Sequence, residues 1–396
     1  MARTPVAEHE GRVRALLAPL RTRSPETVSV AGALGRVLAA DVLSPIDLPP
    51  FRNSQMDGFA VLAADLAAGL PLPIAGEVAA AAGIPNPLVP GTAVRIMTGA
   101  PIPEGADAVV PVEDTTVSAE NTVAIASDWA EGAYVRDVGS DLRAGDRLLP
   151  AGLRLASRHL AALAAAGITA VDAESRVRVA VISTGSELVA PGESLGPGQI
   201  SDSNGTALVA AARDVAAEIV LEGRVVDDRE AFEALLDAAV AAGAELVLTS
   251  GGISQGEYEV VRETLEPRGA LVDVLAMQPG GPQAIGSFAG IPVVCFPGNP
   301  VSSQLSFLLF VEPLLREIAG LPDRIRVTRV LDAPVTSVPG KRQFLRGRTL
   351  PDGRVETLGG PSSHLVAALA AADVLLDVPE DVTDLPAGAS VETWEL

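Results

Sequence analysis

The sequence of 396 residues contains little cysteine, histidine and aromatic side chain. Its single cysteine, Cys295, excludes a disulfide within the chain and a cysteine-based metal cage. The three histidines, His9, His159 and His364, are scattered, so the sequence supports neither a histidine metal site nor a hydrolase triad. Because aromatic residues make up only 3%, the hydrophobic cores must consist of alanine, valine, leucine and isoleucine.

Long apolar runs and excess positive charge are also missing. No uninterrupted apolar run approaches the roughly 18 residues that would indicate a membrane span. The first twenty residues carry acidic side chains and no continuous apolar segment, which is not typical of a signal peptide. With 29 basic and 50 acidic residues the net charge is −21. Nucleic acid and anionic lipid require clustered cations, so we expect neither as a partner. The single cysteine fits a reducing compartment, and we expect a cytoplasmic protein.

The length and the changes in sequence texture predict several domains. Residues 1–45 contain amphipathic stretches that we expect to be helical, one of them capped by Ser24. Residues 46–134 alternate short β-branched runs with proline and glycine, which predicts an inserted, mostly β domain. Residues 135–172 contain more short strands and turns, followed by a helix.

The second half of the chain has a different rhythm. Residues 173–321 alternate apolar strands with amphipathic helices, which predicts a three-layer α/β domain with a largely parallel sheet. A long helix, VSSQLSFLLFVEPLLREIAG, is expected to close this domain. Residues 322–396 return to short β runs and predict a small C-terminal β domain.

Three strands of the predicted α/β domain are followed by unusual loops. Ligands of open α/β sheets bind at the carboxyl ends of the strands. Glycines there let the backbone present several N–H groups to one anion, and a helix N-terminus adds partial positive charge. One such loop alone is more often an ordinary turn, but three together favour an anion-binding site. The candidate binding residues are Thr184, Gly185, Glu187, Ser250, Gly251, Gly252, Ser254, Gly256, Pro297, Gly298, Asn299, Pro300 and Ser302.

Acidic residues accompany these loops. Asp202 lies in the long loop after the first strand, and Glu257 and Glu259 follow the second glycine loop. Carboxylates repel phosphates unless a divalent cation such as Mg²⁺ bridges them, so these three residues are candidate ligands of Mg²⁺. A single surface aspartate is more often a turn former or a helix cap. Asp57 and Asp141 belong to other predicted domains.

Six motifs occur in the order in which the molybdopterin molybdenumtransferases have them, and the whole chain resembles that family. They are DVLSPIDLPPFRNSQMDGFAV, RIMTGAPIPEGADAVVPVED, STGSEL, GQISDSN, TSGGISQGEYE and FPGNPVSS, and the later segments QFLRG and SSHLV are also similar. The resemblance implies a multidomain α/β plus β fold. Its parts are a three-layer α/β molybdopterin-binding domain, an inserted β domain, a discontinuous linker region and a C-terminal β-barrel-like domain.

The resemblance also implies a reaction and an assembly. The family inserts molybdate into adenylylated molybdopterin with Mg²⁺, and the products are molybdenum cofactor and AMP. Its members are homodimers, and the active site combines the α/β domain of one subunit with the inserted domain of the other. Asp57, Asp141 and Asp202 match family aspartates tied to activity, and Glu259 stands where the family usually has aspartate.

This chain departs from the family pattern at three further positions. Gln278 and Gly281 stand where the family commonly has lysine, and Ser186 replaces the aspartate of the usual STGDEL motif. These changes cost the candidate site a cation and move a carboxylate. Two alternatives to an active transferase therefore stay open: a gephyrin-like paralogue that acts as a dimeric scaffold for a partner protein, and a binding module without turnover. Proteins of the same biosynthetic pathway are the other possible partners.

Overall fold

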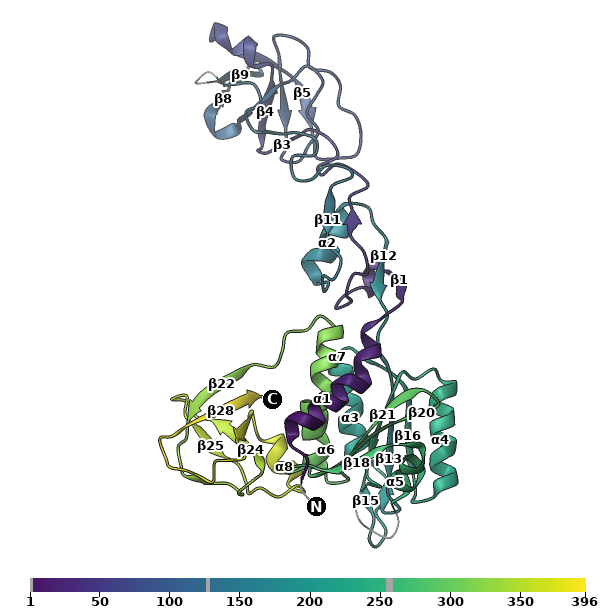
Figure 1. The fold of residues 1–396 in the computed structure, drawn as a ribbon. Coiled ribbons are helices and arrows are strands. Elements are labelled where there is room, and N and C mark those ends of the chain that lie inside the picture. The colour runs from purple at the N-terminus through teal and green to yellow at the C-terminus, as the bar shows by residue number, and fades with distance from the viewer. Residues whose placement is uncertain (1–2, 126–128, 254–258) are drawn as a thin grey trace. The chain divides into compact units, whose positions relative to one another are not determined.

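The chain forms two compact units, each assembled from separate segments. The structure is a computed structural model that describes residues 3–125, 129–253 and 259–396. Figure 1 shows the elements of both units. Unit 1 comprises residues 1–26, 35–37 and 174–396, and unit 2 comprises residues 27–34 and 38–173.

A six-stranded sheet in the order β16-β13-β17-β21-β20-β18 forms the centre of unit 1. The first four strands pair in parallel, and the pairings β21-β20 and β20-β18 are antiparallel, so that β20 alone runs in the opposite direction. The prediction of a largely parallel sheet is confirmed. The sequence interpretation had not assigned β20 as a strand. The strands are β13 (Arg178–Thr184), β16 (Glu218–Val225), β17 (Leu246–Ser250), β18 (Leu271–Val274), β20 (Pro282–Phe288) and β21 (Ile291–Phe296).

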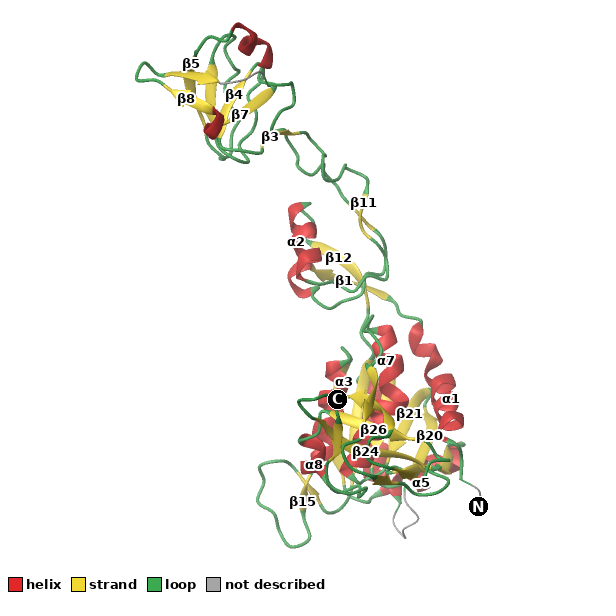
Figure 2. Ribbon diagram, turned by 90° about the vertical axis from the view of Figure 1, so that its left-hand side faces the viewer, coloured by secondary structure: helices red, strands yellow, loops and turns green. Residues whose placement is uncertain are grey.

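Helices cover both faces of this sheet and make the domain three-layered (Figure 1), and Figure 2 shows the same helices in red and the strands in yellow. Side chains from α1 (Val6–Leu17), α3 (Ser203–Asp214) and α6 (Pro300–Ser306) share one core with the sheet. Side chains from α4 (Arg229–Ala241) and α5 (Val260–Leu265) share the core on the opposite face. The predicted three-layer architecture is confirmed.

The amino-terminal helix α1 shows how a helix is specified by spacing. Its buried residues Val6, His9, Val13 and Leu17 recur every three or four positions and therefore lie on one face of the helix. Burial of each valine or leucine side chain contributes about 1.5–3 kcal/mol. This stripe closes the core on the α3 and α6 side of the sheet.

The helix predicted after β21 is interrupted. It consists of α6, a π-helical turn at Phe307–Val311 and α7 (Glu312–Ile318). Pro313 has no backbone N–H, so the carbonyl one turn before it cannot be bonded as in a regular helix, and the wider turn accommodates this defect.

The C-terminal part of unit 1 is a β structure, as predicted. Its sheet has the order β19-β24-β26-β28-β22, and β25 pairs with β24. The buried Glu312 of α7 forms ion pairs with Arg316 and Arg324, which tie α7 to the chain entering this sheet. The elements are β19 (Met277–Gln278), β22 (Arg326–Val330), β24 (Arg342–Thr349), β25 (Val355–Thr357), α8 (Val366–Ala370), β26 (Val374–Val378) and β28 (Ser390–Glu395).

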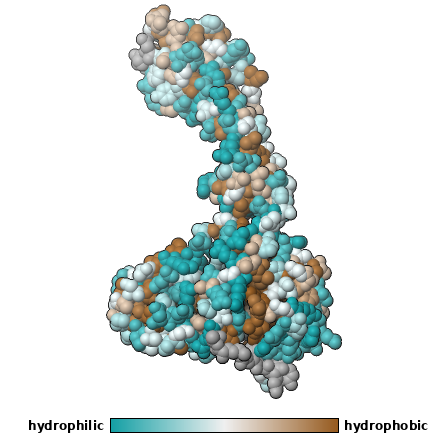
Figure 3. Space-filling view, in the orientation of Figure 1, coloured by the Kyte–Doolittle hydropathy of each residue, from teal (hydrophilic) through white to brown (hydrophobic). Residues whose placement is uncertain are grey.

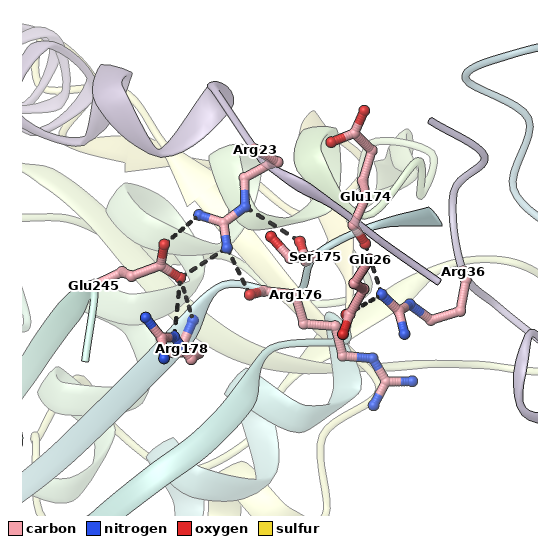
Figure 4. A network of polar contacts seen from close by, with 8 residues as sticks. All are labelled: Arg23, Glu26, Arg36, Glu174, Ser175, Arg176, Arg178 and Glu245. Carbon is pink, nitrogen blue, oxygen red and sulfur yellow. Dashed lines mark hydrogen bonds and ion pairs between the residues drawn. The ribbon is translucent and has the colours of Figure 1, made fainter. Parts of the chain in front are cut away.

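Two buried arginines hold the separate chain segments of unit 1 together (Figure 4). Arg23 donates to both carboxylate oxygens of Glu245 and to two backbone carbonyls of the segment that follows residue 174. Arg36 donates to the Glu26 carboxylate and to the backbone oxygen of Glu174, at 2.7 Å for the latter. Charge-assisted bonds of this kind are among the stronger ones in proteins, so the three segments are fixed to one another.

Unit 2 contains a six-stranded sheet in the order β7-β4-β6-β5-β9-β8. This agrees with the expected β character of residues 46–134. Its strands are β4 (Gly58–Val61), β5 (Leu72–Val78), β6 (Ala93–Ile96), β7 (Ala108–Pro111), β8 (Thr115–Val117) and β9 (Thr122–Ile125).

One predicted helix near the N-terminus is wrong. Residues 25–29, expected to begin a helix capped by Ser24, form strand β1 (Pro25–Ser29), which pairs with β12 (Ala170–Glu174). Thr27 donates to the Asp172 carboxylate at 2.7 Å, a contact that local sequence could not reveal. The helix expected later in this region is confirmed as α2 (Ser157–Ala165).

Short strands also form two-stranded pairs outside the three large sheets. They are β2 (Val42–Leu43) with β11 (Arg147–Leu149), β3 (Asn53–Ser54) with β10 (Val135–Arg136), β14 (Leu188–Val189) with β15 (Ile200–Ser201), and β23 (Val335–Thr336) with β27 (Asp384–Leu385).

The surface is mixed in polarity. Figure 3 shows hydrophilic residues over much of the visible face, with apolar residues among them, which is usual for a folded protein surface. Within the part of the chain that the structure describes, no helix is both long and apolar enough to span a membrane.

A buried histidine on α1 packs against the π-helical turn. The rings of His9 and Phe310 meet edge to face at a centroid distance of 4.8 Å, and His9 is fully buried. Burial lowers the pKa of His9 to about 4, while Asp273 opposes this shift and Arg12 adds to it. The folded protein therefore holds this histidine neutral at pH values where an unfolded chain would protonate it.

His9 should make folding stability depend on pH. Because its folded pKa is below the unfolded value of 6.5, its contribution is complete above pH 6.5 and is lost as the pH falls toward 4. We expect a loss of about 3 kcal/mol in unfolding free energy over this range. Urea denaturation of the wild type and of His9→Leu at several pH values measures it. An equal decrease in both proteins would contradict the assignment.

Candidate functional site

The carboxyl ends of three neighbouring parallel strands meet at one edge of the unit 1 sheet. Ser183 of β13 is in register with Ser250 of β17, and Ser250 is in register with Phe296 of β21. The amide of Gly251 donates to the backbone oxygen of Phe296 at 3.0 Å. The three loops predicted to bind an anion therefore start beside one another.

Glycines let these loops approach more closely than other residues could. Gly251 has φ +92°, and a Cβ atom there would lie 2.4 Å from the backbone oxygen of Thr184. Gly252 has φ +66°, and its Cβ atom would lie 2.9 Å from Thr184 Oγ1. A Cβ atom on Gly298 would lie 3.6 Å from the Cα atom of Gly251. The second loop is thus packed against both the first and the third, which requires glycine at position 251.

The first loop carries a carboxylate beside its glycine. Thr184 is buried and donates to the backbone oxygen of Ser250 at 3.4 Å. A Cβ atom on Gly185 would lie 2.7 Å from Glu187 Oε2, so the exposed Glu187 carboxylate lies against Gly185. The hydroxyl of Ser186 donates to the Asp227 carboxylate at 2.9 Å.

Asp202 begins helix α3 at the same edge. Its Oδ1 atom accepts a hydrogen bond from the backbone N–H of Gly205 at 2.9 Å, and the residue is only 6% exposed. The side chain therefore caps the helix, as the simpler interpretation of the sequence predicted. A Cβ atom on Gly205 would lie 2.6 Å from Asp202 Oδ2 and 2.9 Å from Ser183 Oγ, which places this carboxylate next to the end of β13.

The third loop leads directly into α6. Pro297 is buried, whereas Gly298 and Asn299 are exposed. The backbone oxygen of Asn299 accepts from the amide of Ser303 at 3.0 Å, which closes the first helical turn after Pro300. Ser302 is 2% exposed, so its side chain faces the protein interior.

The second loop and the start of α5 also carry predicted binding residues and metal ligands. Ser254, Gly256 and Glu257 lie outside the described residues. Glu259 is the N-cap residue of α5 and is partly exposed. Among the described residues, no group of three or more histidine, cysteine, aspartate or glutamate side chains could hold a metal ion.

The two remaining aspartates lie in unit 2. Asp57 Oδ1 accepts from the backbone N–H of Thr98 at 2.7 Å and from its hydroxyl at 2.8 Å. The backbone hydrogen bond from Thr98 is the main cause of the lowered pKa of Asp57, so this exposed carboxylate is firmly ionised. Asp141 is exposed in a turn, where its amide donates to the backbone oxygen of Leu48.

Two polar side chains near the strand ends were not identified from the sequence. Asn204 donates from Nδ2 to Ser250 Oγ and to the backbone oxygen of Gly298, each at 2.7 Å. Arg346 is 1% exposed and donates to the backbone oxygens of Ser362 and Gly360. The motifs GQISDSN and QFLRG contained both residues, but only the tertiary contacts distinguish them.

Arg346 brings positive charge close to the third loop. The turn that it binds also contacts α6, because the amide of Val301 donates to the backbone oxygen of Ser363 at 3.0 Å. Arg346 Nε is buried without a hydrogen-bond partner among the described residues, and burial lowers the pKa of this guanidinium. A buried cation whose known partners are backbone carbonyls is suited to an anionic ligand.

The fold and the strand-end loops define a multidomain protein built around an α/β domain of the molybdopterin-binding type. Three family profiles match successive parts of the chain: the MoeA N-terminal region (domain I and II) at residues 4–167, a probable molybdopterin-binding domain at 180–317, and the MoeA C-terminal region (domain IV) at 328–396. The chain belongs to the molybdopterin molybdenumtransferase family.

Relatives of known sequence and structure cover the whole chain. Molybdopterin molybdenumtransferase 2 of Mycobacterium tuberculosis is 44% identical over 406 residues and covers 99% of both chains. The Haemophilus influenzae molybdopterin molybdenumtransferase is 33% identical and covers 92% of both. The crystal structure of a molybdopterin biosynthesis MoeA protein from Pyrococcus horikoshii aligns with a TM-score of 0.81 at 34% identity, over 100% of this chain and 99% of that one.

The helix caps allow the structural role of Asp202 to be separated from any chemical role. Asp228 caps α4 in the same way, with its Oδ1 2.7 Å from the Ala231 amide. We expect Asp202→Ala and Asp228→Ala each to lower the unfolding free energy by about 1 kcal/mol. Asp202→Asn keeps a capping oxygen and should change it by only a few tenths. Urea denaturation measures these values, and an equal loss in Asp202→Asn and Asp202→Ala would show that capping is not what Asp202 contributes.

Proposed function

We propose that this chain is a molybdopterin molybdenumtransferase that transfers molybdenum into adenylylated molybdopterin and releases AMP. The observation that carries the proposal is the meeting of three strand-end loops, packed together through Gly251, beside the carboxylate of Asp202. The molybdopterin molybdenumtransferase names of the full-length relatives support the same substrate class. A scaffold function has no specific observation in its favour.

The strand-end loops are proposed to bind the phosphates and the pterin of the substrate. The glycines let the three loops pack closely, so that backbone N–H groups from neighbouring loops can face one phosphate. The binding set comprises Thr184, Gly185, Glu187, Ser250, Gly251, Gly252, Ser254, Gly256, Pro297, Gly298, Asn299, Pro300 and Ser302. The guanidinium of Arg346 would balance negative charge near the third loop, which matters in a chain of net charge −21.

Mg²⁺ is proposed to accompany the substrate. Mg²⁺ usually binds one or two protein carboxylates together with phosphate oxygens and water. Asp202 at the strand ends, with Glu257 and Glu259 as the further candidates, would supply one or two carboxylates to such a site. The substrate phosphates and water would complete it, because no group of three acidic, histidine or cysteine side chains among the described residues forms a cage. The metal would supply charge neutralisation during cleavage of the phosphoanhydride bond.

A homodimer is proposed to complete the site. Asp57 and Asp141 belong to unit 2, and the resemblance assigns unit 2 of one subunit to the α/β domain of the other. The ionised Asp57, fixed by Thr98, would then act with the partner subunit's loops. Light scattering that gives the mass of a single chain at micromolar concentration would contradict this assembly. We propose a cytoplasmic location for the enzyme.

The reaction gives the direct test. Purified protein with adenylylated molybdopterin, molybdate and Mg²⁺ should release AMP, and omission of molybdate or Mg²⁺ should stop the release. Asp202→Asn should be roughly ten- to a thousandfold slower, because one contact to metal or transition state is lost. Asp228→Asn, which changes the equivalent cap of α4, should retain the wild-type rate. Absence of AMP under conditions where a related transferase produces it would refute the proposal.

Restoring the usual family residues should strengthen molybdate binding. A Cβ atom on Gly281 meets nothing closer than 3.7 Å, so Gly281→Lys is sterically tolerated, and aspartate is a better helix N-cap than Glu259. The double variant Gly281→Lys, Glu259→Asp should lower the half-saturating molybdate concentration by about ten- to a hundredfold, the value of one charge-assisted contact. Ser287→Lys, exposed on β20, adds the same charge elsewhere and should have no effect. If Ser287→Lys lowers the half-saturating molybdate concentration as much as the double variant does, the effect of the added lysine does not depend on its placement at residue 281.

A further inference from the structure

Asn204 is a polar residue on the apolar face of a helix. The buried residues of α3 are Asn204, Gly205, Leu208, Val209 and Ala212, so the amide occupies a position that spacing would assign to a core side chain. It is 8% exposed. Removing an amide from water is unfavourable unless hydrogen bonds replace the lost hydration, so its partners explain why asparagine fits there.

The partners of Asn204 lie on two of the strand-end loops. Its Nδ2 atom donates to Ser250 Oγ, at the end of β17, and to the backbone oxygen of Gly298, in the loop after β21. Both distances are 2.7 Å. Since Asn204 itself follows Asp202 in the first turn of α3, one side chain links three separate segments at the edge where the strands end.

The same edge contains buried polar atoms that the described protein does not satisfy. Asn204 Oδ1 and the hydroxyl of Ser183 are buried without hydrogen-bond partners among the described residues. Ser183 Oγ is close to Asp202, as the contacts of Gly205 show. Native structures rarely leave such atoms unpaired, and binding sites are a recognised exception.

We propose that Asn204 is a positioning residue: it sets the spacing between the Gly251 loop and the Gly298 loop, and so the fit of the nucleotide phosphates between them. This inference rests on the proposed function for the identity of the ligand, but the spacing between the two loops does not depend on any ligand. A leucine at position 204 could fill the volume and would leave both loops without their shared donor. An aspartate would keep the shape, could accept from the Ser250 hydroxyl and would repel the carbonyl of Gly298.

The effect of Asn204 on the two loops can be tested without any substrate. In Asn204→Leu the amides of Gly251 and Ser303, which bond to Phe296 and Asn299, should exchange with deuterium about ten- to a hundredfold faster. In Asn204→Asp the change should be confined to Ser303 and its loop. Thr393→Val is the matched control, because Thr393 is fully buried in the C-terminal sheet and makes two side-chain hydrogen bonds. Unchanged exchange at both loops in both Asn204 variants would overturn the inference, whatever the enzyme does.

Kinetics and binding then separate positioning from mere structural support. Asn204→Leu should raise KM for adenylylated molybdopterin, and Kd for AMP measured by calorimetry, by roughly tenfold or more. Thr393→Val, with a similar loss of stability, should leave both unchanged. If the wild type releases no AMP but exchange and AMP binding respond as expected, the proposed reaction fails while the role of Asn204 is supported. Faster exchange with unchanged KM and Kd would show that Asn204 supports the loops without positioning the ligand, and would overturn the proposal.

Discussion

Parallel pairing forces the ends of neighbouring strands onto one edge of a sheet, and the candidate site depends on this constraint. The crossover helices return each strand in the same direction, so β13, β17 and β21 all end beside one another. Thr184 and Gly298, 114 positions apart in the sequence, are thereby brought into one cluster, with Gly251 in contact with both neighbouring loops. Without the parallel pairing, the loops that contain these glycines would lie apart and would not form one site.

Local charge in this site differs from the charge of the whole chain. The net charge of −21 would disfavour an anionic substrate at long range, but salt screens exposed charges beyond about 10 Å. Inside the fold, the buried Arg346 and the backbone amides act at short range and in lower dielectric. An acidic protein can therefore bind phosphate or molybdate if a few cationic or N–H groups are held close to the ligand.

The sequence predicted the parts of the fold that depend on short-range pattern. The amphipathic stretch RVRALLAPL indicated a helix in the region of α1, and the apolar runs indicated β13, β17 and β21. The glycine and hydroxyl loops after these strands could also be predicted, because glycine in such a position reports a local backbone requirement. The domain limits and the roles of Asp57 and Asp141 stay predictions.

Features that depend on distant partners could not be predicted. Residues 25–29 form a strand because β12 lies alongside, although Pro25 and Glu26 are typical of a helix start. The role of the Asn204 amide is visible only from its hydrogen bonds to Ser250 and Gly298, which are far away in the sequence. The sequence around one strand end does not indicate which side chain will link that strand end to the neighbouring one.

The assembly of unit 1 from separate segments has a consequence for synthesis of the chain. Helix α1 leaves the ribosome early, but the π-helical turn against which His9 packs is made roughly 300 residues later. Unit 2 ends at residue 173 and can fold in the interval, because domains generally fold as units in the order of synthesis. The apolar stripe of α1 stays exposed until α6 and the π-helical turn have been synthesised. Nascent chains stalled before α6 would carry this stripe exposed and would therefore be prone to aggregate.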